Sequence, residues 1–224
     1  MEDLGLVQQL IIPLGGLTLT FNIKVILMTW LVFALLLLFG ILATRKRAFL
    51  PRSLQVLGEM LVDQLYQLTE DAMDRREAEK YGPMIVALFL FLVLSNWIGI
   101  IPHMEEPTRD LNTPLSLGLM GFVIAHYAGI KSKGFKKYAS EYFQPMFFMM
   151  PLNVIGEIAK IVSISFRLFG NIMGGSIIIL VVSYLCYNLL LPPFLNAFFG
   201  IFVGTIQAFV FTMLTIVYIS VQIK

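Results

Sequence analysis

The sequence predicts an all-α integral membrane protein with five membrane helices, the last two long and steeply tilted, and one amphipathic surface helix. Hydrophobic residues make up 58% of the 224 residues, charged residues only 13%, and the mean hydropathy is +0.84. Soluble domains carry about 25% charged residues, so this composition indicates a chain embedded in lipid. Apolar runs of membrane-spanning length recur, and basic residues gather at their ends. We expect a single membrane domain over residues 1–224.

The composition argues against several other classes. A net charge of +2 is too small to indicate a nucleic-acid partner. Cys186 is the single cysteine, so we expect no disulfide framework, no metal and no other cofactor. The sequence contains no glycine-rich phosphate loop with a lysine, so we expect no nucleotide-binding site in this chain. The acidic start MEDLGL does not resemble a secretion signal, so the first apolar run should remain in the mature chain.

The first span is predicted over residues 23–43, an apolar run with Lys24 near its edge. At 1.5 Å per residue, a helix of this length crosses about 30 Å of hydrocarbon. The following segment, RKRAFLPR at residues 45–52, carries four basic side chains. Because basic loops remain in the cytoplasm, we expect the amino terminus outside the cell.

A cytoplasmic amphipathic helix is predicted over residues 53–80. Leucines recur there at steps of three and four residues, and acidic residues occupy the other faces. The leucines are Leu54, Leu57, Leu61, Leu65 and Leu68, and the acidic residues are Glu59, Asp63, Glu70 and Asp71. Such a helix lies on the membrane surface with its apolar face toward the lipid.

Two further spans are predicted over residues 83–101 and 113–130. Pro83 opens the first, which ends at Pro102 before the acidic stretch HMEEPTRDLN. We expect this stretch to be an external loop. The second span returns to KSKGFKK, whose four lysines indicate the cytoplasm again.

The last two elements are unusually long, at residues 151–191 and 194–222. No proline interrupts the first between Pro151 and Pro192, so as one helix it would reach about 60 Å, twice the hydrocarbon thickness. It must therefore tilt steeply or bend. Pro192 and Pro193 are expected to turn the chain into the second long helix, which brings the carboxyl terminus to the cytoplasm. We expect these two helices to form an ion path.

Arg167 is the deepest cation in these elements. Its guanidinium stays protonated, so it needs an anion or water to offset burial. Glu157 lies ten residues from Arg167, about 15 Å along a helix. Lys160, three residues from Glu157, is a nearer partner for that carboxylate. The leading hypothesis is that another chain supplies the counter-ion of Arg167.

Polar and small residues form a stripe on each long helix, because their spacing follows the helical repeat. The first stripe is Asn153, Glu157, Lys160, Arg167, Asn171 and Gly174, and the second is Asn196, Gly200, Gly204, Gln207 and Phe211. Intramembrane polar residues line an ion path or a protein interface more often than they face lipid. The two stripes are expected to face each other or a common partner.

Two segments carry a resemblance to a known family. PLNVIGEIAKIVSISFRLFGNIMGG, followed by IQAFVFTMLTIVYI, resembles subunit a of F-type ATP synthases, in its bacterial branch. SNWIGIIP, DLNTPLSLGL and GIKSKGFKKY support the resemblance, which covers most of the chain from about Pro83 onward. By this resemblance Arg167 corresponds to the family's essential arginine, Asn171 to the asparagine four residues later, and Gln207 to the glutamine that faces the arginine.

The resemblance implies a non-catalytic stator subunit in the bacterial inner membrane. Its implied partners are the rotating ring of c subunits, whose carboxylates would meet Arg167 one at a time, the b subunits of the peripheral stalk, and the lipid bilayer. Ions would pass through two offset half-channels and drive ATP synthesis. The residues expected along the path are Asn153, Glu157, Lys160, Arg167, Asn171, Ser176 and Gln207, with Gly175, Gly200 and Gly204 as small lining residues.

One departure from the family bears on the coupling ion. Many bacterial members carry an acidic residue nine positions after the arginine and a histidine seven positions before the glutamine, where this chain has Ser176 and Gly200. Either water carries protons there or the ion is Na⁺, which needs oxygen ligands and no titrating group. We favour H⁺ and keep Na⁺ open.

Other interpretations of these residues remain open. Arg167 alone is also compatible with an arginine that reaches the membrane interface, and the Glu157–Lys160 pair with a purely structural salt bridge. His126 is compatible with an interfacial packing role, and the glycines with close helix packing. A secondary transporter, or another channel with Arg167 as its gate, is the alternative function, although no second RLFGN-like segment marks a paired half. A membrane hydrolase would need a nucleophile and a base at matched depth, and this sequence does not offer such a pair.

Overall fold

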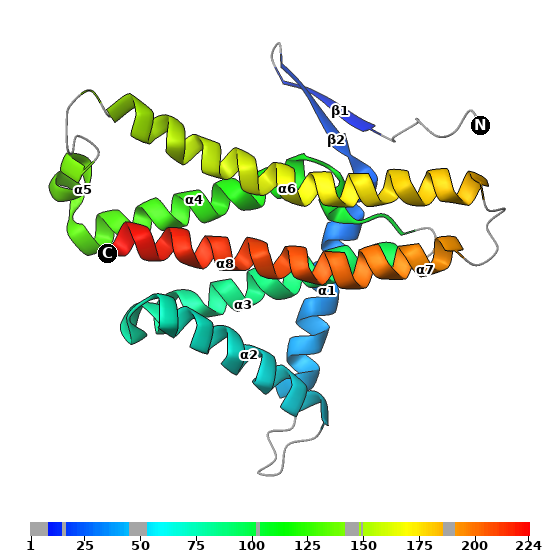
Figure 1. The fold of residues 1–224 in the computed structure, drawn as a ribbon, viewed down its shortest axis with the longest axis horizontal. Coiled ribbons are helices and arrows are strands. Elements are labelled where there is room, and N and C mark those ends of the chain that lie inside the picture. Colours follow the sequence, from blue (N-terminus) through cyan, green and yellow to red (C-terminus); the bar gives the residue numbers. More distant parts are fainter. Residues whose placement is uncertain are drawn as a thin grey trace.

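The computed structural model describes residues 9–14, 17–44, 53–101, 104–141, 148, 150–185 and 191–224. Its principal elements are a hairpin of two strands followed by helices, shown in Figure 1. In chain order these are β1 (Gln9–Leu14), β2 (Leu17–Asn22), α1 (Ile23–Thr44), α2 (Ser53–Ala72), α3 (Arg75–Trp97), η1 (Ile98–Ile100), η2 (Pro107–Arg109), α4 (Asn112–Lys133), α5 (Phe135–Glu141), α6 (Met150–Leu185), α7 (Leu191–Ala197), η4 (Phe198–Val203) and α8 (Gly204–Ile223).

In the described part of the chain, five helical segments are long and apolar enough to cross a membrane, which confirms the predicted fold class. They are Ile23–Leu42, Arg75–Ile100, Asn112–Lys133, Met150–Leu185 and Leu191–Ile223. The 36 residues of α6 make it about 54 Å long, well beyond a hydrocarbon layer of about 30 Å. It fits such a layer only when steeply inclined.

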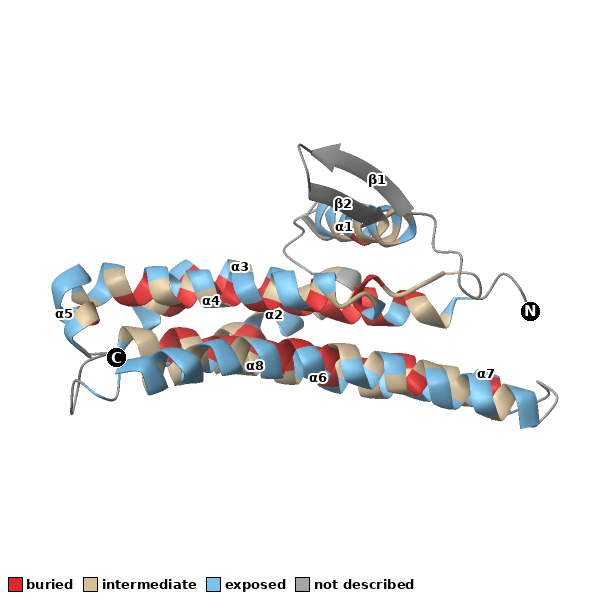
Figure 2. Ribbon diagram, turned by 90° about the horizontal axis from the view of Figure 1, so that it is seen from above, coloured by how far each residue is buried: buried red, intermediate tan, exposed pale blue. Residues whose placement is uncertain are grey.

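The long helices lie in two layers, one of α3 and α4 and the other of α6, α7 and α8 (Figure 2). In Figure 1 the helix α1 runs at a steep angle to the long helices, and in Figure 2 it is seen end-on, on the outer side of the layer of α3 and α4. The 22 residues of α1 give it a length of about 33 Å, which matches the hydrocarbon thickness. If α1 crosses the membrane upright, then α6 and α8 lie far from upright.

The core lies between the two layers. Leu92 of α3, Leu168 of α6 and Phe211 of α8 are fully buried in one apolar cluster. In lipid the hydrophobic effect does not drive helices together, so close packing through small residues matters most. On α4, a Cβ at Gly118 would lie 2.6 Å from the Ser165 hydroxyl of α6, and one at Gly129 would lie 2.9 Å from a backbone oxygen of α8. The glycines of α4 therefore set its contact with both long helices.

The amphipathic segment expected over residues 53–80 is divided between two helices. The surface helix α2 ends at Ala72, and α3 begins at Arg75 and continues through Pro83. Asp74 is the N-cap of α3 with an extended backbone, and its carbonyl accepts hydrogen bonds from the N–H groups of Glu77 and Ala78. The hydroxyl of Ser220 also binds the carbonyl of Ala72, which ties the end of α2 to α8. The chain therefore reverses direction at the N-cap residue Asp74, and Pro83 does not start the helix.

The two long elements also differ in their ends from the expected ranges. Described α6 ends at Leu185, and residues 186–190, which include the end of the expected 151–191 helix, lie outside the described residues. Pro192 and Pro193 occupy the first turn of α7, where a missing N–H costs little. The helix then passes through a π-helical segment, η4, into α8. The last element therefore begins at Leu191, three residues before the expected start.

A β-hairpin precedes the first span and was not predicted. Its strands pair antiparallel, from Gln9 opposite Asn22 to Leu14 opposite Leu17. The alternation in LTLTFN has the period of a strand, but it is short and runs directly into the apolar residues of α1. The basic segment 45–52, on which the expected orientation depends, lies outside the described residues.

Candidate ion-translocation site

Arg167 lies in the middle of α6 with an exposed side chain. Its neighbours Ile164 and Leu168 are buried in the core, whereas Arg167 lies beside them on the exposed part of the helix. Among the described residues, none forms an ion pair or hydrogen bond with its guanidinium. A permanently charged group on a membrane helix therefore lacks a partner within the described part of the chain.

The surface beside Arg167 is open. A Cβ added at Gly156, Gly170 or Gly174 would meet no atom within 4 Å. Phe166 and Ile177 on the same helix are exposed apolar side chains. A helix surface that combines glycines with apolar side chains allows another helix to approach closely.

Asn171 lies one helical turn after Arg167 and connects α6 to α8. Its side-chain nitrogen Nδ2 donates a hydrogen bond of 2.7 Å to Oε1 of Gln207. Gln207 is only 4% exposed, and its own Nε2 has no hydrogen-bond partner among the described residues. A buried amide donor without a partner usually marks a place where water binds.

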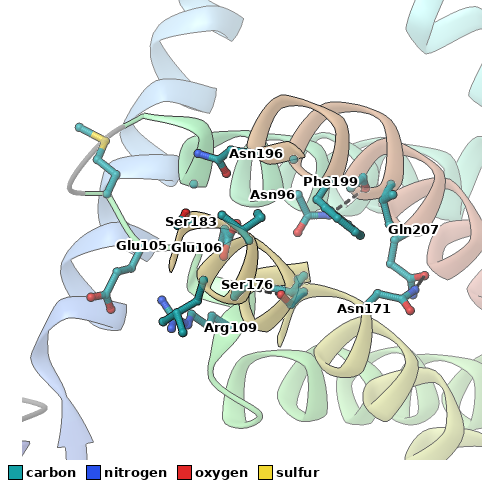
Figure 3. Close-up of a pocket in the computed structure, with 18 residues that line it drawn as sticks. Asn96, Glu105, Glu106, Arg109, Asn171, Ser176, Ser183, Asn196, Phe199 and Gln207 are labelled. Atoms are coloured by element: carbon teal, nitrogen blue, oxygen red, sulfur yellow. Dashed lines mark hydrogen bonds between the residues drawn. The ribbon is translucent and has the colours of Figure 1, made fainter. Parts of the chain in front are cut away.

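A cavity of about 460 Å³, which we call the loop cavity, lies beside Gln207 (Figure 3). Its walls come from the end of α3, the loop at residues 104–109, the second half of α6, and the α7–η4–α8 helix. Most of its polar groups are amides and hydroxyls. They belong to Asn96, Asn171, Ser176, Ser183, Asn196 and Gln207. Within the described residues, the charged groups of its lining are Glu105, Glu106 and Arg109.

Glu105 and Glu106 both belong to this lining, and both residues are partly buried. Burial raises the pKa of Glu106 above its usual value, and the positive charge of Arg109 opposes that rise. The carboxyl group packs over Gly99, where a Cβ would overlap it. Tertiary packing thus holds a titratable group at the cavity, in a loop outside the spanning helices.

Asn96 holds the loop against the helices. Its Nδ2 donates to the carbonyl of Gly204 at 2.8 Å, and its Oδ1 accepts from the Thr108 hydroxyl at 2.9 Å. Both Asn96 and Thr108 are buried. None of Asn96, Glu106, Thr108 and Arg109 was predicted as a site residue. The asparagine inside the apolar run SNWIGI is the sequence feature from which this site could have been predicted.

A second cavity, which we call the Glu157 cavity, measures about 190 Å³ and lies between α4, the first half of α6 and the end of α8. Lys160 Nζ donates to Glu157 Oε1 at 2.6 Å and also lies 5.6 Å from the ring centre of Tyr218. His126 stacks on Phe122 at 3.8 Å between ring centres. The polar and titratable residues that line the Glu157 cavity are His126, Glu157, Lys160, Thr215, Tyr218 and Gln222.

The two cavities divide the predicted site residues into groups. Glu157 and Lys160 line the Glu157 cavity, and Asn171, Ser176 and Gln207 line the loop cavity. The Ser176 hydroxyl donates to the Ile172 carbonyl at 3.0 Å. Arg167 and Asn153 line neither cavity.

The three predicted lining glycines all allow close helix contacts. A Cβ would lie 3.0 Å from the Phe199 ring at Gly175 and 2.8 Å from the Asn96 Cβ at Gly204, and at Gly200 it would contact Ile100. Gly200 and Gly204 also border the loop cavity. Packing and lining are therefore compatible roles at these two positions.

The described residues offer no group of three or more His, Cys, Asp or Glu side chains that could hold a metal ion. The groups brought together are instead amides, hydroxyls, two separate sets of charged side chains and one lone guanidinium. Such groups order water, exchange protons and attract an external carboxylate.

Comparison with known proteins gives consistent results. A family model described as "ATP synthase A chain" matches residues 26–220. The chain is 40% identical to "ATP synthase subunit a" of Moorella thermoacetica over 192 residues, which cover 86% of this chain and 87% of that protein. It is 35% identical to "ATP synthase subunit a 2" of a Bradyrhizobium species, covering 100% of this chain and 97% of that one. "ATP synthase subunit a" of Priestia megaterium is 35% identical, with 93% and 94% covered.

Proposed function

Because the chain belongs to the ATP synthase A chain family, as subunit a of a bacterial F-type ATP synthase, we propose that it provides two ion half-channels to the rotating c ring. In this role it is a non-catalytic stator subunit that couples ion flow to rotation and ATP synthesis. The loop cavity and the Glu157 cavity are assigned as the two half-channels.

The position of Arg167 carries this proposal. Along α6, the lining of the Glu157 cavity ends at Ile164 and that of the loop cavity begins at Asn171. Arg167 lies between these two residues, on the exposed face. A fixed cation between two separate water-accessible cavities repels a cation that would pass directly from one to the other.

The same cation attracts a carboxylate from the ring. At an effective dielectric constant of 20, two opposite charges 4 Å apart attract by about 4 kcal/mol. An arriving carboxylate that pairs with Arg167 therefore releases its bound ion, and a departing one takes up an ion again. The open glycines Gly170 and Gly174 give a ring helix room beside Arg167.

We infer the orientation from the basic end of α4. Lys131 and Lys133 lie in its last turn, and basic loops remain in the cytoplasm. The end of α8 lies beside this turn, because the Ser132 hydroxyl donates to the Ile223 carbonyl at 3.4 Å. The Glu157 cavity, which reaches Gln222 near the end of α8, is therefore assigned to the cytoplasmic side, and the loop cavity to the outside. We accordingly assign the amino terminus to the outside and the carboxyl terminus to the cytoplasm of the bacterial inner membrane.

The helix α1 is the least covered of the five spanning segments, with 6% of its apolar window buried. Trp30, Leu27 and Leu37 are among its exposed side chains. We assign this surface to lipid and to the b subunits of the peripheral stalk.

H⁺ is the coupling ion that we favour. The amides and hydroxyls of the loop cavity support a chain of water, which conducts protons without a titrating group at Ser176 or Gly200. The same oxygens are potential Na⁺ ligands, so Na⁺ is the second candidate. ATP-driven ²²Na⁺ uptake into vesicles decides between them, because uptake that persists with a protonophore would favour Na⁺.

The test of the function is Arg167→Ala in the assembled complex. Proton pumping by ATP hydrolysis and ATP synthesis should both be lost while the complex still assembles. Arg76→Ala, at an exposed arginine on α3 outside both cavities, is the matched control and should pump normally. Normal coupled synthesis in Arg167→Ala would contradict the assignment and favour a transporter or another type of channel.

A further inference from the structure

The loop cavity has very few charged groups. Its lining on α6, α7 and α8 consists of apolar, amide and hydroxyl side chains among the described residues. The charged groups all come from the loop that leads from η1 into η2, namely Glu105, Glu106 and Arg109. Any side chain of the described lining that exchanges protons with water near neutral pH must therefore be sought in this loop.

Of the two glutamates, Glu105 is engaged elsewhere. Its Oε1 accepts a hydrogen bond of 3.3 Å from Lys24 of α1, and Figure 3 shows its carboxylate turned away from Asn171 and Gln207. Glu106 instead packs against η1, because Gly99 leaves the space that its carboxyl group occupies. No salt bridge to a described residue is formed by Glu106 within 4.0 Å.

We propose that Glu106 is the proton-exchange group of the loop cavity: its carboxylate accepts a proton from hydronium on the external side and returns it to water inside the cavity. Each step moves one proton between a carboxyl oxygen and a water oxygen, and Glu106 ends in its starting form. This inference rests on the proposed function, because it requires the loop cavity to be the external half-channel.

The electrostatics of the loop suit this role. Burial raises the pKa of Glu106, Arg109 opposes the rise, and the neighbouring Glu105 adds to it. The charge of Glu105 is in turn reduced by its ion pair with Lys24. Asp110, the next acidic residue of the loop, accepts a hydrogen bond from the Asn112 backbone. A carboxyl group exchanges protons most efficiently when its pKa lies near the working pH, and burial shifts Glu106 in that direction.

The inner end of the cavity offers a receiving group for the water chain. Gln207 is 4% exposed, and its Nε2 has no partner among the described residues although it borders the cavity. A water held by this donor lies beside Asn171, one turn from Arg167. Glu106 and Gln207 thus line one cavity, and Gln207 contacts Asn171, one turn from Arg167.

The experiment measures ATP synthesis in proteoliposomes of the whole complex. The pH on the loop-cavity side is varied at constant pH on the other side and constant membrane potential. In the parent complex the rate should fall steeply as that pH rises through the pKa of Glu106, because fewer Glu106 side chains then carry a proton to pass on. In Glu106→Gln the rate should drop by about fivefold or more, and this step should disappear, which leaves only the gradual fall that the smaller pH gradient causes.

Three further variants separate proton exchange from a structural role. Glu106→Asp should keep the pH dependence, shifted but present. Gly99→Ala should displace the carboxyl group and lower the rate while Glu106 is still in the chain. Glu79→Gln, at an exposed glutamate of α3 outside both cavities, is the control and should keep the parent profile.

The outcomes distinguish this inference from the proposed function. A Glu106→Gln complex with an unchanged rate or an unchanged pH profile overturns the role of Glu106, provided that Arg167→Ala is inactive. A lower rate with the same pH profile means that Glu106 is structural, which also overturns it. An active Arg167→Ala complex overturns the proposed function instead.

Discussion

The side chain of Asn171 on α6 donates a hydrogen bond of 2.7 Å to the side chain of Gln207 on α8. This bond joins the two long helices one turn from Arg167, at the inner end of the loop cavity. Both residues were placed on facing stripes from their helical spacing, and the structure brings them into contact.

The contact predicts a specific crosslink. With Cys186→Ser to remove the native thiol, Asn171→Cys combined with Gln207→Cys should form a disulfide under oxidant in the membrane. Asn171→Cys combined with Phe209→Cys is the control, because Phe209 is exposed on another face of α8. Non-reducing electrophoresis checks the result. Equal crosslinking in both pairs would mean that the helices do not hold one fixed register.

Arg167→Lys should restore little of the function lost in Arg167→Ala. Lysine carries a compact charge that loses its proton more easily when water is excluded, and it cannot bind a carboxylate through two parallel hydrogen bonds. We expect coupled ATP synthesis to fall by an order of magnitude or more, with ATP hydrolysis by the complex retained. Synthesis above about half of the parent rate would show that any cation suffices there.

Gly204 and Gly174 should respond to alanine in opposite directions. At Gly204 a Cβ would lie 2.8 Å from the Cβ of Asn96, so Gly204→Ala should separate α8 from α3 and destabilise the fold by about 1–3 kcal/mol. At Gly174 nothing lies within 4 Å, so Gly174→Ala should leave stability unchanged or raise it by about 0.5–1 kcal/mol. Thermal unfolding in detergent measures both. Equal effects would contradict the close contact at Gly204.

The ion pair of Glu157 and Lys160 can be tested by charge reversal. Glu157→Gln should leave Lys160 without its 2.6 Å partner and slow ATP-driven proton pumping. The exchange Glu157→Lys with Lys160→Glu restores a pair of the same charges at the same spacing. Full recovery of pumping in the exchange variant would identify a structural salt bridge, and no recovery would indicate that the position of each charge along the cavity matters.

The spanning helices were predictable because long apolar runs bounded by basic residues have few alternative structures. The helix boundary near Pro83 was not predictable, because a proline within the first helical turns is compatible with either the start of a helix or its continuation. Burial of Met73, Ala78 and Tyr81 decides it, since these side chains pack only if the chain reverses at Asp74. This packing involves α8, more than a hundred residues later, and no local pattern reveals it.

The candidate site was predictable on the two long helices and not in the loop. The stripes with Arg167, Asn171 and Gln207 follow from helical spacing. Glu106, in contrast, lies in an acidic stretch that resembles any solvated external loop. Its burial depends on Gly99 and on the hydrogen bonds that Asn96 makes with Thr108 and Gly204. These contacts join three separate parts of the chain.

The π-helical segment η4, Phe198–Val203, changes how positions on the last helix correspond between relatives. A π-helical turn contains one residue more than an α-helical turn, so it rotates everything before it by about 100° relative to an uninterrupted helix. Deleting one residue within η4 would return the segment to an α-helix and swing Asn196 away from the cavity it shares with Gln207. Counting seven positions back from the glutamine therefore identifies spatially equivalent residues only between chains that share this extra residue.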